Sequence, residues 1–176
     1  MIRPLASFTA TLEDAAQLVG ASLKGASLSF TGITHIDSEV EPGDLFIAVP
    51  GARVHGATFI DSAMKRGAVA VLTDEAGLAY FTGVPALVVG DVRTAGALLA
   101  ASLYRYPTRN LVSIGITGTN GKTTVSTLLY QIFEAVGRDT GLIGTVETRI
   151  GSEGLKSSRT TPEASDLQAL AAVMRE

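Results

Sequence analysis

Two hydrophobic patterns alternate over residues 1–104, one with the spacing of a helix face and one made of short apolar runs. Helical spacing occurs in three segments, each flanked by residues typical of helix ends. We expect helices over 12–19, 58–66 and 92–104. The apolar runs, separated by glycines and polar turns, predict buried strands. We expect these strands near 27–30, 33–36, 45–49, 68–72 and 86–89. Strands that alternate with helices indicate an α/β fold.

A different order of elements follows residue 110: a strand, a glycine-rich loop and a long amphipathic helix. The apolar run 111–116 has the pattern of a buried strand. After the loop, apolar residues recur at the spacing of one helix face, namely Val125, Leu128, Leu129, Ile132, Phe133 and Val136. Gly137 is typical of the position just past a helix end. A further strand is expected near 141–146, and a further helix beginning near Pro162.

The polar segment 104–110, which contains Pro107, is the best candidate for a domain junction. We therefore predict a small N-terminal α/β domain over 1–107 and the first part of a P-loop-type α/β domain over 108–176. A doubly wound nucleotide-binding sheet needs about twice the length of this second part. We expect that the chain is a fragment, cut inside its catalytic domain.

Composition excludes several classes of function. The chain has 176 residues and a net charge of −3, so it lacks the basic excess typical of nucleic-acid-binding proteins. It has no cysteine, which excludes disulfides, thiolate metal sites and a cysteine nucleophile. Its start is too polar for a signal peptide, and no apolar run is long enough to cross a bilayer. We expect a cytoplasmic protein that neither binds nucleic acid nor inserts into a membrane.

The glycine-rich loop carries the clearest chemical signal, a G-x-x-G-K-T pattern between the expected strand and helix. In that arrangement the loop N–H groups and the positive end of the helix dipole converge on one anion site. Lys122 would reach the outer phosphates of a nucleotide, and the Thr123 hydroxyl would bind Mg²⁺. The predicted phosphate-binding residues are Gly118, Thr119, Asn120, Gly121, Lys122, Thr123 and Thr124.

The loop departs from the usual G-x-x-x-x-G-K-[ST] pattern, because Ile116 stands where the first glycine is expected. A bare G-x-x-G-K-T also occurs in ordinary turns. The flanking strand and helix favour phosphate binding over a plain turn. The pattern leaves the reaction open.

Several motifs follow one another in a fixed order along nearly the whole chain. They are Asp37-Ser38, Pro42-Gly43-Asp44-Leu45-Phe46, Pro50-Gly51, the run 67–72, the loop 116–124, and Arg159-Thr160-Thr161-Pro162-Glu163 followed by Leu167-Gln168. Together they resemble the Mur ligases, the ATP-dependent enzymes that extend the peptide of the bacterial cell-wall precursor. The segment 159–163 is similar to the members that add the third residue. In this family the shortened phosphate loop is the usual form.

The resemblance implies a uridine-nucleotide-binding domain followed by an ATPase domain. It also implies a reaction: ATP would phosphorylate UDP-N-acetylmuramoyl-L-alanyl-D-glutamate, and a diamino acid would attack the acyl phosphate to form an amide. The expected cofactor is Mg²⁺, with Lys122 and Thr123 as catalytic residues. The diamino acid is diaminopimelate or lysine, and the Ala- and Gly-rich composition hints at diaminopimelate. The product would serve peptidoglycan synthesis, and thereby cell shape and division. We expect a monomer.

The resemblance also assigns substrate-binding residues. Those expected at the uridine-nucleotide end are Ile36, Ser38, Ala52, Arg53 and Val54, and those expected at the muramoyl-peptide part are Thr160 and Thr161. Each has a plainer interpretation. Ser38 could be an ordinary turn hydroxyl, Arg53 a solvated loop charge, and the threonine pair a helix cap before Pro162.

Two positions depart from the family pattern. Glu39 stands where an arginine usually follows Asp-Ser, which puts in doubt a charge contact from this turn to an anionic substrate. His55-Gly56-Ala57 replaces the more usual Asp-Gly-His order, so no binding role is assigned to His55, which we expect to be structural or at the surface. The acidic residues Asp37, Glu39, Glu41 and Asp44 are interpreted as a solvated loop rather than a metal site.

Two other functions stay open at this point. A non-catalytic nucleotide-binding module would use the loop as it stands. A folate polyglutamate enzyme would share the loop but is not expected to carry the 38–72 series. The family's later Mg²⁺-binding acid, its carbamylated lysine and the domain that selects the amino acid would lie beyond Glu176, so we expect no ligation by this chain alone.

Overall fold

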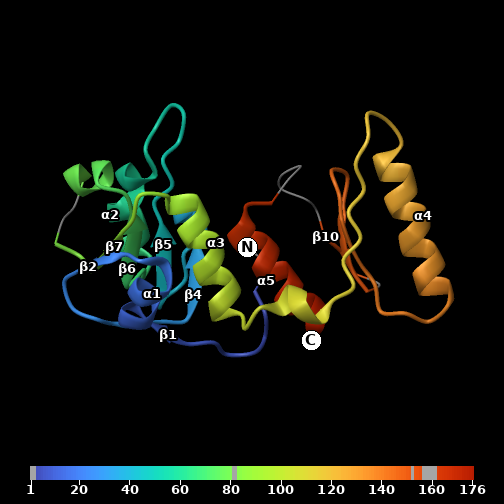
Figure 1. Cartoon of the computed structure of the whole chain (residues 1–176), viewed down its shortest axis with the longest axis horizontal. Coiled ribbons are helices and arrows are strands. Elements are labelled where there is room, and N and C mark those ends of the chain that lie inside the picture. Colours follow the sequence, from blue (N-terminus) through green and yellow to red (C-terminus); the bar gives the residue numbers. More distant parts are fainter. Residues whose placement is uncertain (1–2, 81–82, 152, 156–161) are drawn as a thin grey trace.

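The computed structural model describes residues 3–80, 83–151, 153–155 and 162–176. The molecule is elongated, with a sheet and its helices at one end and a long helix with a small antiparallel sheet at the other (Figure 1). The last helix, α5, lies between these two parts (Figure 1). Among the described residues, no helix is both long and apolar enough to span a membrane.

The larger part is built on a five-stranded sheet with the order β2-β7-β6-β5-β4. Its strands are β2 (Ser22–Lys24), β4 (Gly32–Thr34), β5 (Asp44–Ile47), β6 (Ala70–Thr73) and β7 (Ala86–Val88). The pairs β4–β5, β5–β6 and β6–β7 are parallel, and β2 joins β7 antiparallel. A separate pair, β1 (Ala10–Thr11) and β3 (Ser29–Phe30), is antiparallel.

Alternating side chains of the central strands enter two different apolar clusters. On β5, Leu45 and Ile47 belong to the cluster formed with α1 (Leu12–Val19) and α3 (Val92–Leu103). Phe46, between them, belongs to the cluster formed with α2, which spans Ile60–Lys65. Since successive residues of a strand point to opposite faces, both faces of the sheet are covered by helices. This explains why the strands read as unbroken apolar runs.

The predicted helices and strands of this part are confirmed. Thr11 accepts a hydrogen bond from the Asp14 N–H at the start of α1, and Asp91 accepts one from the Thr94 N–H at the start of α3. Gly20, with a φ of +64°, ends α1. The 3₁₀ turn Gly56–Phe59 precedes α2, so the helix predicted from residue 58 begins two residues later. The short strands β1 and β2 were not predicted.

The smaller part contains α4 (Lys122–Ala135) and the sheet β10-β9-β8. Its strands are β8 (Gly141–Ile143), β9 (Thr148–Ile150) and β10 (Glu153–Leu155), all antiparallel. The strand predicted over 111–116 is wrong. Residues 107–110 form a 3₁₀ turn, 112–118 have no regular structure, and Val112 is 95% exposed. A strand needs a neighbour to satisfy its backbone, and within the described ranges none pairs with this run.

The helix predicted after the glycine-rich loop is confirmed as α4. The apolar face predicted for this helix is not buried. Val125, Leu128, Ile132 and Val136 are all exposed. The contact of α4 with the small sheet instead includes Tyr130, which is buried and donates a hydrogen bond from its hydroxyl to the Gly151 carbonyl at 2.6 Å. The spacing therefore predicted the helix correctly and its packing incorrectly.

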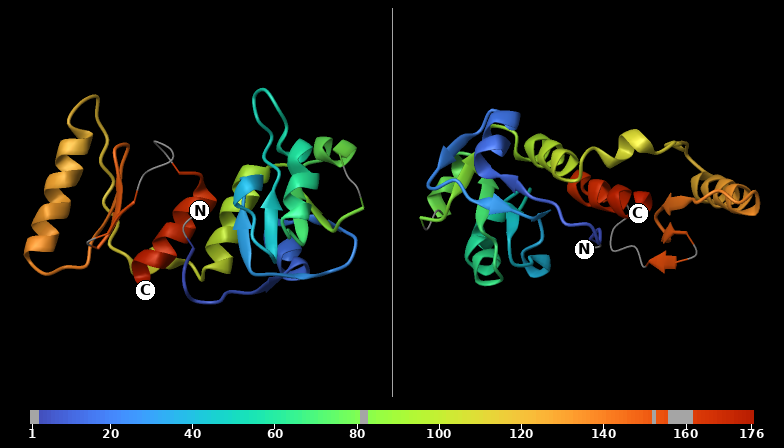
Figure 2. Two further views of the ribbon diagram at one scale, coloured as in Figure 1. Left: turned by 180° about the vertical axis from the view of Figure 1, so that it is seen from behind. Right: turned by 90° about the horizontal axis from the view of Figure 1, so that it is seen from below.

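The helix predicted from Pro162 is α5, which spans Ala164–Arg175. It packs along α3, and Ala169 and Ala172 enter the same apolar cluster as that helix. Figure 2 shows α5 beside α3 from two further directions. Small side chains at this contact let the two helices approach closely, so α5 joins the larger part of the molecule.

Tyr104, at the end of α3, provides a test of this packing. Its side chain is buried and meets Phe8 edge-on, with ring centroids 5.3 Å apart. Burial raises the pKa of Tyr104 from 10.0 to about 12. The neutral phenol is therefore favoured in the folded state.

We predict that the stability from this effect is complete below pH 10 and is lost as the pH rises through 12. The free energy of unfolding, measured with urea, should fall by about 2 kcal/mol more between these pH values in the wild type than in Tyr104→Phe. The two proteins share every other titrating group, so the difference isolates Tyr104. Parallel pH profiles would contradict the burial of this hydroxyl in the folded state.

Candidate functional site

The parallel strands β4, β5 and β6 end at the same edge of the sheet, where ligands of open α/β sheets usually bind. The predicted residues Ile36 and Ser38 directly follow β4. The predicted loop 52–54 follows β5. The fold thus brings two of the predicted substrate-binding segments to neighbouring strand ends. Ser38 and all three loop residues are exposed, and Ile36 is half-buried.

The turn that carries Ser38 is the 3₁₀ helix Asp37–Glu39. The Asp37 carboxylate accepts a hydrogen bond of 2.6 Å from the Ser62 hydroxyl of α2. The Ile36 N–H donates to the Thr34 hydroxyl at 3.2 Å. Asp37 therefore fastens the turn to α2, and the Ser38 hydroxyl remains at the surface.

The buried ion pair between Arg3 and Asp44 also holds the 37–39 turn in place. Asp44 is only 1% exposed, so its interpretation as part of a solvated acidic loop is wrong. Its carboxylate accepts a hydrogen bond of 2.7 Å from Arg3 Nη1 and one of 2.8 Å from the Glu41 N–H. Arg3 Nη2 also donates to the Glu39 carbonyl at 3.1 Å. Arg3 thus links the buried Asp44 carboxylate to the backbone of the 37–39 turn.

Arg3 and Asp44 carry opposite charges and attract each other. Burial alone would lower the pKa of Arg3, but the hydrogen bond and the charge of Asp44 outweigh burial and raise that pKa. The Arg3 side chain remains 18% exposed. Asp44 depends more strongly on the pair, because a buried carboxylate without a partner is costly.

The loop after β5 projects from the sheet edge and is the teal loop that rises above β5 in Figure 1. Pro50 and His55 form an isolated antiparallel bridge at its base. The Gly56 N–H donates to the Val49 carbonyl at 2.9 Å. A Cβ on Gly56 would lie 2.7 Å from the Val49 backbone, so only glycine allows this approach. The stem is thereby closed, and Arg53 lies at the exposed tip.

His55 is the residue of this edge that sequence reasoning left without a role. Its ring lies between the Ala57 N–H and the Asp74 carboxylate, at 3.0 Å from each. The expectation that it is structural or at the surface agrees with its 17% exposed side chain. The one sign of a further role in the sequence was the departure of His55-Gly56-Ala57 from the Asp-Gly-His order that the resemblance implies.

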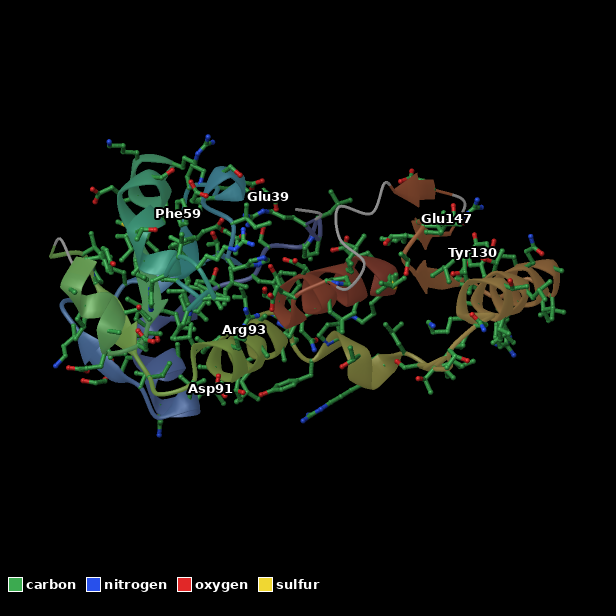
Figure 3. All side chains as sticks on the ribbon, turned by 90° about the horizontal axis from the view of Figure 1, so that it is seen from above. Glu39, Phe59, Asp91, Arg93, Tyr130 and Glu147 are labelled. Carbon is green, nitrogen blue, oxygen red and sulfur yellow. The ribbon has the colours of Figure 1, made fainter. Side chains whose placement is uncertain are left out.

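The start of α5 reaches the same sheet edge. Glu163 accepts hydrogen bonds of 2.6 and 2.7 Å from Arg93 of α3. Asp166 lies 3.7 Å from His35, which directly follows β4. Figure 3 shows Arg93 on α3 next to α5. Thr160 and Thr161, predicted to contact the peptide part of the substrate, lie outside the described residues just before this helix.

The phosphate loop has the backbone that its glycines predict. Gly118 and Gly121 have φ values of +152° and +79°, and Gly121 directly precedes α4. L-residues with a side chain rarely adopt such values. The Lys122 ammonium donates to the Gly118 carbonyl at 2.6 Å, and Thr123 and Thr124 are exposed in the first turn of the helix. Residues 118–124 therefore place the start of α4 at the surface.

The phosphate loop and the sheet edge are not brought together. In Figure 3, Tyr130 and Glu147 lie at one end of the molecule and Glu39 and Phe59 at the other. Within the described ranges, no group of three or more histidine, aspartate or glutamate side chains is placed to hold a metal ion. Thr123 is thus the one predicted Mg²⁺ ligand whose position the structure gives.

Two family descriptions match the chain on either side of the 104–110 junction. "Mur ligase family, catalytic domain" matches residues 29–103, which contain the sheet edge. "Mur ligase middle domain" matches residues 116–176, which contain the phosphate loop. The chain belongs to the Mur ligase family.

Curated Mur ligases align with almost the whole chain. UDP-N-acetylmuramoyl-L-alanyl-D-glutamate–2,6-diaminopimelate ligases of Streptomyces coelicolor and Streptomyces avermitilis are 52% and 53% identical over 176 residues. A UDP-N-acetylmuramyl-tripeptide synthetase of Leifsonia xyli subsp. xyli is 44% identical over 178 residues. These alignments cover 99% of this chain but only 33–35% of each relative. The chain therefore spans about a third of the length of these relatives.

Solved Mur ligase structures resemble the fold. MurF from Acinetobacter baumannii is 25% identical with a TM-score of 0.59, over 76% of this chain and 29% of that one. A UDP-N-acetylmuramoyl-L-alanyl-D-glutamate–2,6-diaminopimelate ligase is 28% identical with a TM-score of 0.59, over 83% of this chain and 30% of that one. The predicted α/β fold and the resemblance to Mur ligases are confirmed.

The Arg3–Asp44 pair of this Mur ligase chain yields a stability prediction. Arg3→Ala leaves a buried carboxylate without its charged partner and should lower the free energy of unfolding by about 3 kcal/mol. Arg66→Ala, which removes an exposed arginine of the α2 end, should change it by less than about 0.5 kcal/mol. Urea denaturation at neutral pH measures both. Equal effects of the two substitutions would show that Asp44 does not depend on Arg3.

Proposed function

We propose that this chain forms the substrate-binding and phosphate-binding part of an ATP-dependent ligase of peptidoglycan precursor synthesis. Its acceptor is UDP-N-acetylmuramoyl-L-alanyl-D-glutamate, and the amino acid added is 2,6-diaminopimelate. The observation that carries this proposal is the 52–53% identity, over 99% of the chain, to two ligases with that name. The same names favour the third-residue ligase over a folate polyglutamate enzyme and over a module without catalysis.

The reaction proceeds in two steps. A γ-carboxylate oxygen of the D-glutamate attacks the γ-phosphorus of ATP, and the bond to ADP breaks to leave an acyl phosphate. The amine of the diamino acid then attacks the acyl carbon, loses a proton and expels inorganic phosphate. Both steps depend on positioning and on neutralising phosphate charge. These are functions that a phosphate loop and a substrate-binding sheet edge supply.

The sheet edge is the proposed site for the uridine-nucleotide end. Ile36 and Ser38 would contact it from the turn after β4, and Ala52, Arg53 and Val54 would contact it from the loop after β5. Support comes from the exposure of Ser38 and of the loop on neighbouring parallel strands. The start of α5 at the same edge supports a role for Thr160 and Thr161 at the peptide part.

The loop 118–124 is the proposed ATP site. Its N–H groups and the start of α4 would bind the phosphates, and Lys122 would neutralise the outer ones. Support comes from the exposure of Lys122 and from its position over the loop carbonyls. Mg²⁺ would add positive charge at the phosphates, and the Thr123 hydroxyl is an oxygen ligand of the kind that it prefers.

The domain boundary, the cellular location and the oligomeric state are also proposals. A boundary near residue 107 is supported by the two family descriptions, which leave residues 104–115 unmatched. We further propose a cytoplasmic monomer without affinity for nucleic acid, in keeping with a net charge of −3.

Two variants test the proposal, each serving as the control for the other. Ser38→Ala should weaken binding of UDP-N-acetylmuramoyl-L-alanyl-D-glutamate about fivefold, the effect of one lost hydrogen bond, and leave Mg-ATP binding unchanged. Lys122→Ala should weaken Mg-ATP binding more than about tenfold and leave binding of the uridine nucleotide unchanged. Isothermal titration calorimetry of the 176-residue chain measures all four values. Absence of uridine-nucleotide binding by the wild type would contradict the proposal.

A further inference from the structure

We propose that His55 is a positioning residue that holds the loop 51–54 in its binding conformation by linking the ends of β5 and β6. The inference rests on the proposed role of this loop in binding the uridine nucleotide. His55 would contact no substrate itself. Its effect would pass through the stem of the loop to the residues at the tip.

Hydrogen bonds on both ring nitrogens fix His55 in place. Nδ1 accepts the Ala57 N–H at 3.0 Å, and Nε2 lies 3.0 Å from Asp74 Oδ1. Since Nδ1 accepts, it carries no proton, and in the neutral ring the proton resides on Nε2 and is donated to Asp74. The His55 side chain thus accepts a hydrogen bond from a backbone N–H in its own loop and donates one to a carboxylate in the segment after β6.

Asp74 extends the link beyond β6. Its Oδ1 also accepts the Gly77 N–H at 2.8 Å, which fixes the turn after that strand. A Cβ on Gly77 would lie 1.9 Å from Thr73 Oγ1 and 3.2 Å from His55 Cε1, so the turn lies close against the imidazole. The Tyr80 ring also stacks on His55, with 6.2 Å between the ring centroids. The imidazole is therefore held by its neighbours in position and orientation.

The consequence for the loop follows from where these bonds lie. The first stem residue, Pro50, continues from β5, whereas the returning stem begins at His55. Between them, residues 51–54 are exposed. Without the His55 side chain the returning stem would keep backbone contacts such as the Gly56 N–H bond to Val49, but it would lose its link to the end of β6. The tip would then sample more conformations, and ordering them would weaken ligand binding.

Three variants of the 176-residue chain test the inference. His55→Ala removes both bonds. His55→Asn keeps an acceptor for the Ala57 N–H, since its Oδ1 corresponds to Nδ1 of the imidazole. Thr11→Ala is the matched control, because it removes a capping bond of the same kind, from the Asp14 N–H, at α1. The helix α1, whose start Thr11 caps, lies away from the loop after β5 (Figure 1).

Two measurements separate positioning from stability. The first is the rate of trypsin cleavage after Arg53, which reports on loop mobility and needs no ligand. The second is the affinity for UDP-N-acetylmuramoyl-L-alanyl-D-glutamate by calorimetry. We expect His55→Ala to raise the cleavage rate at least about fivefold and to weaken binding about tenfold. His55→Asn should lie closer to the wild type in both, and Thr11→Ala should match the wild type in both while lowering the melting temperature by about 4 °C.

The outcomes distinguish this inference from the proposed function. If the wild type binds the nucleotide and His55→Ala changes cleavage and affinity no more than Thr11→Ala does, the positioning role is wrong. If the wild type does not bind the nucleotide, the proposed function fails instead, and the cleavage rates still decide whether His55 anchors the loop. Should His55→Ala fail to fold, the same comparison between His55→Asn and Thr11→Ala decides, with faster cleavage in His55→Asn supporting the link to Asp74.

Discussion

Parallel pairing of β4, β5 and β6 is the constraint on which the rest of the candidate site depends. It places the ends of three strands at one edge, and every segment that follows them reaches the surface there. Ser38, the 51–54 loop and Asp74 belong to separate segments of the sequence, and this pairing places all three segments at the same edge. Helices on both faces bury the strands, so the edge is rigid while its loops remain exposed. A firm sheet with exposed loops is an arrangement well suited to binding.

Most of the fold could be predicted because its local signals agree with its tertiary packing. Thr11, Gly20 and Asp91 mark helix ends by chemistry that operates within a few residues. The run 111–116 is the exception, because its local pattern did not determine its structure. An apolar run predicts burial, but whether it becomes a strand depends on a partner, and the strands β8, β9 and β10 pair with one another. The exposed face of α4 and the contact of α5 with α3 have the same explanation, since spacing defines a face and not the surface that covers it.

The candidate site likewise contains some features that the sequence could predict and others that it could not. The sequence predicted the positions of the loops at the sheet edge and the helix that follows the glycine-rich loop, because each is a continuous stretch of sequence. The supporting contacts join distant positions and could not be predicted. Arg3 reaches Asp44 across 41 residues, and His55 reaches Asp74 across 19.

We propose that the sheet edge of this Mur ligase chain binds the uridine nucleotide independently of the phosphate loop. Hydrogen–deuterium exchange of the 176-residue chain, with and without UDP-N-acetylmuramoyl-L-alanyl-D-glutamate, tests this most directly. We expect slower exchange in residues 35–39 and 51–57 and no change in 118–124. Protection confined to 118–124, or an unchanged sheet edge at saturating ligand, would contradict it.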